Sequence, residues 1–274
     1  MKIDTHQHFW KFDPVRYSWI NDTMQVLRKD FLPDDLNPDL KRNAIDGCIA
    51  VQADQSEKET QFLLDLATEY NFIKGVVGWL DLRDKNVGDR LDFYSQNNLL
   101  KGLRHIVQSE LDDFMIQENF QRGIGILGKY NLTYDILIYP NQMNAAFQLI
   151  SKYPDQLFVI DHLAKPSIKK QLISTWENEI KKLALWPNVS CKLSGLVTEA
   201  DWNNWKMSDF RPYLDVVVEA FGIKRVMFGS DWPVCLLAAS YSQVFNIVAD
   251  YFENFTVEEK EKVFGTNAIK FYNI

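Results

Sequence analysis

Two of the chain's four histidines, His6 and His8, lie one residue apart near the start of the sequence. The segment around them, residues 3–9, contains isoleucine, threonine and phenylalanine, which favour a β-strand. In a strand, residues i and i+2 point to the same face, so the two imidazoles would lie side by side. Such a pair could hold a metal ion or polarise a substrate carbonyl, although two histidines on a solvated edge strand would show the same pattern.

Asp231 and His162 are the next candidates, and each follows a short apolar run far along the chain. Asp231 stands in Gly-Ser-Asp-Trp-Pro at 229–233, a pattern typical of a strand that stops at a tight turn. Its carboxylate could bind a metal or take a proton from water, or it could cap the following helix. A lone His162 would more often be a core histidine bonded to the backbone, but its place at a strand end favours a site shared with His6 and His8.

Eight short apolar, β-branched runs would position these residues, and helix-like segments separate most of them. Strand and helix patterns that alternate in this way predict βα units and a parallel sheet, and eight units predict a closed (β/α)8 TIM barrel of the α/β class. The runs are residues 2–9, 45–53, 73–82, 99–107, 132–139, 157–163, 189–195 and 225–231.

Local signals mark where several helices begin and end. Residues 56–59 and 256–259 fit the capping box, in which Ser or Thr is followed three residues later by Glu. Asn37 followed by Pro38 predicts an N-cap with proline at the first helical position. Residues 212–221 have helical spacing and end at Gly222, a residue typical of helix C-caps.

The longest segment without regular periodicity, residues 10–34, follows the first predicted strand. In a barrel it leaves the end of the strands that carries the active site, and loops of this length are more often functional than idle. An aromatic cluster packed under its own loop would explain the same composition. The aromatic residues are Trp10, Phe12, Tyr17, Trp19 and Phe31.

Further polar residues fall near the ends of the predicted strands. A barrel interior is usually filled by Val, Ile and Leu, so inward polar groups would be costly without partners or a function. Arg104 and His105 are neighbours in one strand and must face opposite sides, and the sequence leaves open which one faces the site. The candidates are Gln52, Asp54, Arg104, His105, Asp135, Tyr139, Lys192 and Ser194.

The length of 274 residues is normal for an α/β barrel, which has about 250, and no low-complexity linker divides the chain, so we expect one domain over residues 1–274. A hydrophobic content of 46% is enough for a large core. The net charge of −7, without runs of like charge, disfavours binding to nucleic acid or to an anionic membrane.

No apolar run approaches the roughly 20 residues that span a bilayer, and the start of the chain has no apolar signal-peptide region. The three cysteines lie in apolar surroundings and indicate free thiols in a reducing compartment. We therefore expect a cytoplasmic protein.

The set of His6, His8, His162 and Asp231 resembles the amidohydrolase superfamily (amidohydrolase family 2), whose fold is a (β/α)8 barrel. The resemblance covers nearly the whole chain. His-Gln-His at 6–8 matches the family's His-x-His of strand one, His162 its strand-six histidine and Asp231 its strand-eight aspartate. The closing Gly-Thr-Asn-Ala at 265–268 is also similar to the family's C-terminal Gly-x-Asn-Ala.

Five short strings are similar to the sugar-acid lactonase branch, the fuconolactonase-like and rhamnonolactonase-like proteins, and Thr-Glu-Ala-Asp-Trp at 198–202 also fits it. The resemblance implies hydrolysis of a sugar-acid lactone to the free acid. It implies Asp231 as the general base that activates water, with the histidines polarising the carbonyl directly or through a metal ion. The strings are Gly-Trp-Leu-Asp-Leu at 78–82, Lys-Gly-Leu-Arg-His at 101–105, Asp-His-Leu-Ala-Lys-Pro at 161–166, Cys-Lys-Leu-Ser-Gly-Leu at 191–196 and Gly-Ser-Asp-Trp-Pro at 229–233.

The sequence departs from the binuclear members of the superfamily, which use a carboxylated lysine or glutamate on strand four and a histidine on strand five. Here strand four offers Arg104 and His105, and strand five has Tyr-Asp-Ile at 134–136, so we do not expect a second metal. The three histidines and Asp231 could hold one zinc-like divalent ion with an open position, or the site could work without a metal.

Polar and aromatic side chains near the strand ends are the candidates for holding substrate hydroxyls or a carboxylate. Trp79 and Trp232 could stack on a sugar ring, although tryptophans that pack a barrel are commoner. The expected substrate-binding residues are Arg104, Lys192, Gln52, Trp79, Asp135, His105 and Trp232.

Other interpretations stay open at this point. A decarboxylase or an amide hydrolase of the same fold could act on a small carboxylate, because a fold alone does not fix a function. A non-catalytic binding barrel is favoured by the missing ligands on strands four and five. A glycosidase would need two spaced carboxylates, for which Asp135 and Asp231 could be proposed. The sequence does not decide which lactone is used, its ring size, or whether the chain forms an oligomer.

Overall fold

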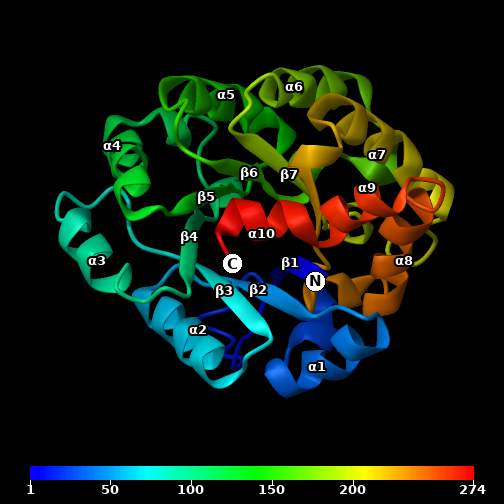
Figure 1. The fold of residues 1–274 in the computed structure, drawn as a ribbon, viewed down its shortest axis with the longest axis horizontal. Coiled ribbons are helices and arrows are strands. Elements are labelled where there is room, and N and C mark those ends of the chain that lie inside the picture. Colours follow the sequence, from blue (N-terminus) through cyan, green and yellow to red (C-terminus); the bar gives the residue numbers. More distant parts are fainter.

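Eight parallel strands are hydrogen-bonded in chain order, and helices surround them (Figure 1). The computed structural model describes residues 1–274. Each of the eight predicted runs contains one strand, which confirms the (β/α)8 TIM barrel. The strands are β1 Ile3–Gln7, β2 Gly47–Val51, β3 Ile73–Gly78, β4 Leu100–His105, β5 Thr133–Ile136, β6 Phe158–Ile160, β7 Val189–Leu193 and β8 Val226–Phe228.

The last strand meets the first through a short seam. The backbone N–H of Asp231 donates to the carbonyl of His6 at 2.7 Å, and the N–H of His8 donates to the carbonyl of Trp232 at 2.7 Å. Both bonds lie at the carboxyl ends of the two strands. The seam that nearly closes the barrel therefore also brings the aspartate from the end of the chain to the histidines from its beginning.

The ten α-helices follow the strands and cover the outside of the barrel, except for the last, which crosses it (Figure 1). They are α1 Pro33–Arg42, α2 Glu57–Glu69, α3 Val87–Tyr94, α4 Glu118–Leu127, α5 Met143–Lys152, α6 Ser174–Ala184, α7 Met207–Phe221, α8 Tyr241–Tyr251, α9 Val257–Glu261 and α10 Asn267–Tyr272. None of them combines the length and the apolar character that a bilayer crossing needs.

The predicted capping box at the start of α9 is confirmed, whereas the one at the start of α2 forms only in half, because the Glu59 carboxylate accepts from two backbone N–H groups ahead of the helix and not from that of Ser56. The Ser56 hydroxyl accepts from the N–H of Glu59 at 3.2 Å at the start of α2, and Thr256 accepts from the N–H of Glu259 at 3.3 Å at the start of α9. Gly222 ends α7 with φ of 68°, a conformation that costs glycine little. The C-cap prediction is therefore confirmed too.

Two predicted helix starts are wrong. Helix α1 begins at Pro33, not at Pro38, because the Asp35 carboxylate accepts from the N–H of Leu32 at 2.8 Å and fixes the first turn there. Helix α7 likewise begins ahead of the predicted residues, where Asp209 accepts from the N–H of Lys206 at 2.8 Å. Each helix also contains a proline in its second turn, where the missing N–H removes one backbone hydrogen bond.

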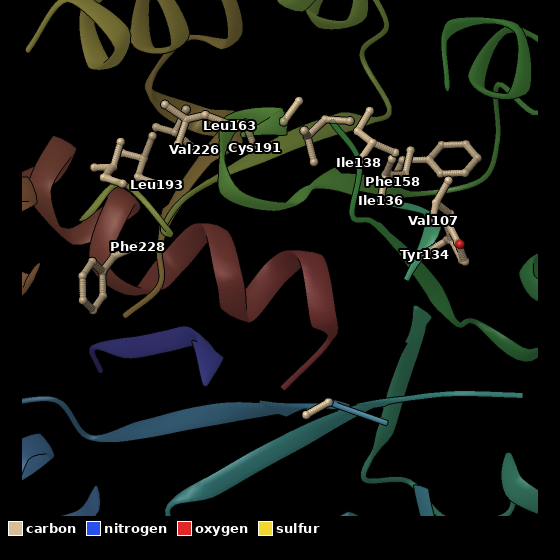
Figure 2. Packing of buried hydrophobic residues seen from close by; sticks show 14 of the residues in the cluster. Val107, Tyr134, Ile136, Ile138, Phe158, Leu163, Cys191, Leu193, Val226 and Phe228 are labelled. Atoms are coloured by element: carbon tan, nitrogen blue, oxygen red, sulfur yellow. The ribbon is translucent and has the colours of Figure 1, made fainter. Parts of the chain in front are cut away.

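The main core lies between the strands and the helices outside them. Figure 2 shows part of it, with Tyr134, Phe158, Cys191 and Val226 contributed by the four neighbouring strands β5 to β8. All four side chains are fully buried. Burial of apolar surface at about 25 cal/mol per Å² makes this layer the main source of stability of the fold.

A second, smaller core fills the barrel at the amino ends of the strands. It contains inward-facing aliphatic residues of five strands, and α10 closes it from below with Ala268, Phe271 and Tyr272. Helix α10 crosses the centre of the ring of strands in Figure 1. The strand residues are Ile3, Ile49, Val51, Val77, Val159 and Met227.

The aromatic segment after β1 forms a packed cluster around Trp10. The Trp10 ring lies 5.9 Å from Tyr17, 5.9 Å from Trp19 and 5.5 Å from Phe31, measured between ring centroids. The hydroxyl of Tyr17 also donates to the buried carboxylate of Glu59 at 2.8 Å. These contacts fix the segment over the rim of the barrel, as the packing interpretation predicted.

Candidate active site

Three imidazoles surround one carboxylate oxygen at the carboxyl end of the barrel. The distances from Asp231 Oδ1 are 3.5 Å to Nε2 of His8, 3.8 Å to Nε2 of His162 and 4.0 Å to Nε2 of His6. All four side chains are buried. The spatial arrangement expected from the sequence is therefore present.

Hydrogen bonds orient two of the imidazoles, for His8 from the side away from Asp231 and for His6 at the nitrogen nearest to it. Nδ1 of His8 lies 2.7 Å from the carbonyl oxygen of Val51, which can only accept, so this nitrogen carries the proton. Nε2 of a neutral His8 then presents a lone pair to Asp231 Oδ1. Nε2 of His6 accepts from the guanidinium of Arg104 at 3.1 Å. Nε2 of His8 and Oδ1 of Asp231 are thus two acceptors that face each other. A cation between them, or a water that donates to both, would satisfy this pair.

Burial keeps the histidines neutral. It lowers the pKa of His6 and of His8, and it lowers the pKa of His162 to about 4 although Asp231 acts in the opposite direction. Burial alone would raise the pKa of Asp231, but His162, His8 and Lys165 outweigh it and hold that pKa below its usual range. Neutral imidazoles beside an ionised carboxylate are the protonation states that a metal site or a general base requires.

These donors fit one divalent ion. Ligand atoms of His6, His8 and Asp231 all lie within 4.8 Å of one another, and two imidazoles with one carboxylate are a common zinc set. The carbonyl of Val51 orients His8 from behind, as is usual for histidine ligands. The hydrogen bond from Arg104 to His6 is the one contact that an ion bound to His6 would replace.

The backbone is strained where it presents the site. His162, Leu163, Ala164 and Lys165 have φ of 52°, 54°, 55° and 51°, and Asp231 has φ of 58°. The left-handed region costs a non-glycine residue of order 1 kcal/mol or more, so such residues persist only where the surroundings hold them. Asp231 does not cap a helix with its side chain; its strained turn aims the carboxylate at the imidazoles instead.

A layer of buried charges lies beneath the imidazoles. Lys192 Nζ donates to Asp135 at 2.5 Å and lies 3.1 Å from Asp161, while Arg104 donates to Asp161 at 3.1 Å. The hydroxyl of Tyr272 in α10 donates to Asp135 at 3.0 Å, which connects this layer to the apolar core below. Two cations and two carboxylates thus balance in the centre of the barrel.

The pKa values of the two carboxylates in this layer are shifted in opposite directions. Burial raises the pKa of Asp135 to about 6 against the opposing effect of Lys192. Burial acts on Asp161 in the same direction, but Lys192, His6 and Arg104 together outweigh it and hold the pKa of Asp161 well below its usual range. Asp161 is therefore the permanent negative charge behind His6, whose Nδ1 lies 3.3 Å from it.

A cavity of about 440 Å³ opens above the imidazoles, a volume within the usual range of about 300–1,000 Å³ for small-molecule sites. Its wall combines polar groups from the strand ends with aromatic and aliphatic side chains from the loops. The lining includes Trp19 and Met24 of the aromatic segment, so that segment both packs and forms part of the wall. The principal polar lining residues are His8, Arg104, Gln108, His162, Lys165, Glu199 and Asp231.

The residues predicted to form the site fall into three groups. His8, Arg104, His162 and Asp231 line the cavity. A second group is buried beneath it, where each contacts a lining residue or a neighbour in the charge layer; this group contains His6, Lys192, Gln52 and Asp135.

The third group, His105, Trp79 and Trp232, does not line the cavity. His105 faces away from the barrel centre, where it accepts from the Trp79 indole at 3.2 Å, lies 2.9 Å from Glu110 and stacks on Phe114. Arg104 is consequently the strand-four residue that faces the site. Trp232 packs against Phe31 near the seam.

Several residues of this region were not predicted, and Asp161 and Lys165 are two of them. Asp161 directly precedes His162, and strict alternation along a strand would place the two on opposite faces. Strand β6 ends at Ile160, so the chain turns and both side chains reach the interior. A carboxylate beside a strand-end histidine in an apolar run was the available signal. Lys165 depends on the left-handed turn, which no residue type in 162–165 indicates.

The nearly closed α/β barrel and the histidine-aspartate cluster at its carboxyl end define a barrel hydrolase. The chain belongs to the amidohydrolase family, whose model, described as "Amidohydrolase", matches residues 3–274. Membership in this family confirms the resemblance seen in the sequence.

Named relatives and a solved structure agree with this assignment. The chain is 39% identical over 284 residues to an L-fucono-1,5-lactonase of Burkholderia multivorans, covering 99% of this chain and 96% of that one. It is 33% identical over 280 residues to an L-fucono-1,5-lactonase of Burkholderia ambifaria, covering 100% and 96%. A crystal structure of an amidohydrolase from Burkholderia multivorans with bound zinc superposes with a TM-score of 0.97 at 38% identity, covering 100% and 99%.

Proposed function

We propose that the chain hydrolyses a sugar-acid lactone, an aldonolactone such as fucono- or rhamnonolactone, to the free acid. The observation that carries the proposal is the Asp231 carboxylate, which lines the cavity with three imidazole nitrogens 3.5–4.0 Å from its Oδ1. The full-length relatives named L-fucono-1,5-lactonase support a lactone over an amide or a decarboxylation substrate.

Hydrolysis of a lactone needs a base for water and donors for the oxyanion that forms on the carbonyl. Asp231 is ionised and faces the cavity, so it takes a proton from the water that attacks the carbonyl carbon. Ser194 lies 2.8 Å from Nδ1 of His162 and can donate to it, which leaves the N–H on Nε2 of His162 for the oxyanion. Arg104 adds a fixed positive charge on the same wall.

A divalent ion fits this account as a cofactor held by His6, His8 and Asp231. When bound, it would polarise the carbonyl and lower the pKa of water in the site. His162 shares Asp231 with that set but keeps its own partner, Ser194, and we assign it to the oxyanion.

The buried charge layer positions the groups that line the cavity. Gln52 accepts from Arg104 through its backbone carbonyl and donates to the Arg104 carbonyl at 3.1 Å through its side chain. Asp135 holds Lys192, Lys192 holds Asp161, and Asp161 in turn holds His6 and Arg104. We propose that Arg104 contacts the substrate, while Gln52, Lys192 and Asp135 act through it.

A lactone panel tests the proposal. Purified protein is assayed with a pH indicator against five- and six-membered sugar lactones, beside a decarboxylation assay on small aromatic carboxylates. We expect acid release from at least one sugar lactone and no decarboxylation. Inactivity on all lactones together with activity in the decarboxylation assay would contradict it.

The same preparation tests the metal. Elemental analysis should find about one equivalent of a divalent ion, and a chelator should lower lactone turnover at least ~10-fold, with recovery on adding zinc. Full turnover in metal-free protein would remove the ion from the account and leave Asp231 and the imidazoles to act alone.

A further inference from the structure

Lys165 is an ammonium ion on the cavity wall to which the steps above give no task. Its side chain is only 15% exposed, and Nζ donates to Glu199 Oε1 at 3.0 Å. An ammonium group has three N–H donors, and the Glu199 contact is the single hydrogen bond that Nζ makes to the protein. Two donors are therefore left for a molecule in the cavity.

The strained turn at residues 162–165 places His162 and Lys165 on the same wall. Four consecutive residues with positive φ are costly, and the turn is held by the bond from the Lys165 N–H to the His162 carbonyl at 2.7 Å. The Trp176 indole anchors it further by donating to the Leu163 carbonyl at 2.7 Å. The ring of Tyr139 lies 5.5 Å from Lys165 Nζ and limits where the ammonium can move.

Ring opening needs a proton that the other lining groups are poorly suited to give. The ring oxygen of an aliphatic lactone leaves as an alkoxide, which is a stronger base than a phenolate. His8 carries its proton on Nδ1, away from the cavity, and the Nε2 N–H of His162 is already assigned to the oxyanion. Arg104 is committed to Asp161 and Gln52, and a guanidinium does not give up a proton in proteins.

We propose that Lys165 is the catalytic residue that protonates the ring oxygen of the lactone as the ring opens; this inference rests on the proposed lactonase function. Water adds to the carbonyl carbon, and its proton goes to Asp231. The bond between the acyl carbon and the ring oxygen then breaks, its electron pair stays on that oxygen, and a proton from Lys165 converts the oxygen to a hydroxyl. Asp231 returns its proton to the lysine through solvent, so the balance is lactone plus water to hydroxy acid.

Charge and burial around the ammonium agree with this role. Burial alone would lower the pKa of Lys165, but Glu199, with smaller contributions from Tyr139 and Asp231, outweighs it and raises that pKa. Lys165 is therefore protonated when the substrate binds. Glu199 acts as the positioning residue for the ammonium.

The test compares two leaving groups. An aryl lactone such as dihydrocoumarin expels a phenolate, whose conjugate acid has a pKa of about 10, and needs little help from an acid. A sugar lactone expels an alkoxide and needs that help. Removing a general acid typically costs 10²–10⁴-fold, so Lys165→Met should lower kcat on the sugar lactone by ~10²-fold or more, with KM changed less than ~3-fold. On the aryl lactone its kcat should change less than ~5-fold.

Conservative and control variants separate catalysis from structure. Lys165→Arg keeps the charge but not a transferable proton, so it should stay as slow as Lys165→Met on the sugar lactone. Glu199→Gln should lose ~3- to 10-fold in kcat. Lys169→Met is the matched control, because Lys169 is 63% exposed, pairs with Asp201 and does not line the cavity; its kinetics should equal those of the wild type. Thermal melting and metal content are measured for every variant.

Three results would overturn the role of Lys165. They are equal loss on both lactones, recovery by Lys165→Arg, and a rise in KM with intact kcat. If Lys165→Met does not fold, Lys165→Gln and Glu199→Gln carry the same comparison. If the wild type does not hydrolyse aryl lactones, the role of Lys165 is decided by the separate effects on kcat and KM for the sugar lactone and by the Lys165→Arg result. A wild type without any sugar-lactone turnover would instead refute the proposed function, which distinguishes the two failures.

Discussion

The two ends of the barrel interior differ in the chemistry of their side chains: one end is apolar and the other is polar and charged. Toward the amino ends of the strands, the barrel encloses aliphatic side chains that α10 covers. The carboxyl ends hold the imidazoles, Asp231 and Lys165, and His162, Lys165 and Asp231 lie on turns with positive φ. Between the two lies the charge layer of Asp135, Lys192, Asp161 and Arg104.

The contrast indicates that one end of the barrel mainly stabilises the fold and the other carries the reactive groups. The amino end gains stability from burial of apolar surface and presents no reactive groups. At the carboxyl end, strained backbone and desolvated charges lower the stability of the fold. The same features hold hydrogen-bond donors in fixed positions around a cavity. The charge layer belongs to both, because Tyr272 of α10 and His6 of the site contact its two carboxylates. Changes in each region should therefore have different consequences.

The charge layer should give the largest effect on stability. Lys192→Met leaves two buried carboxylates with Arg104 as their sole full positive charge, and removing one partner of a buried ion pair costs about 3–5 kcal/mol. Chemical denaturation should show that loss. Lys182→Met removes an exposed ion pair with Glu179 and should change the free energy of unfolding by less than ~0.5 kcal/mol. Similar losses in both variants would refute a structural role for the layer.

A substitution at Gly195 should distinguish the effect of backbone strain on stability from the effect of a displaced His162 on turnover. Its φ is 63°, and a Cβ there would lie 2.6 Å from Cγ of His162, so Gly195→Ala must displace the imidazole. A shift of about 1 Å in a catalytic group can cost ~10²-fold, and we expect a fall in kcat of that order. Gly222→Ala is the control, since Gly222 also has positive φ but has no atom within 4 Å of its Cβ position.

Both glycine variants should lose of order 1 kcal/mol of unfolding free energy from the strained φ, Gly195→Ala should lose more because its Cβ meets His162, and only Gly195→Ala should lose turnover. Equal kinetics in the two variants would show that the packing of Gly195 against His162 does not matter for catalysis.

Asp135 should make stability depend on pH. Its pKa is about 6 in the folded chain against an ordinary value of 3.8, so the folded state binds more protons between pH 4 and 6. The contribution of this group to stability is therefore present at low pH and is lost as the pH rises through about 6. Asp135→Asn removes the titration, so the unfolding free energy of the variant should rise relative to that of the wild type over this interval. If the unfolding free energies of the wild type and of the variant change with pH in parallel, the raised pKa of Asp135 is contradicted.

Trp79 should give the smallest effect. Its indole donates to His105 outside the cavity, so Trp79→Phe should change KM for a sugar lactone less than ~2-fold. A larger rise in KM would restore the hypothesis that Trp79 stacks on the sugar. The same measurement on Trp19→Phe is informative because Trp19 does line the cavity.

The fold was predictable because its signal is repeated. Eight apolar runs separated by helical patterns leave few alternatives, and errors at single boundaries, such as the starts of α1 and α7, do not change the order of strands. His6, His8 and Asp231 were predictable for a related reason. The carboxyl ends of parallel strands meet at one rim, so residues at those ends converge wherever they lie in the sequence.

The remaining site residues depend on local geometry that alternation does not describe. Lys165 and Asp161 reach the interior because β6 stops at Ile160 and the chain then turns with positive φ at residues that are not glycine. Arg104 and His105 could be assigned to opposite faces, but only the register of β4 decides which face is inside. Tryptophans are large enough to serve either in packing or in binding, and composition does not distinguish the two.

Turnover of a sugar lactone by Asp231→Asn, measured beside the wild type, tests the central claim most directly. The substitution keeps the shape of the side chain and removes its ability to take a proton, so the variant should melt near the wild-type temperature and lose ~10³-fold or more in kcat. Turnover close to that of the wild type, in a correctly folded variant, would contradict the claim that this carboxylate activates the attacking water.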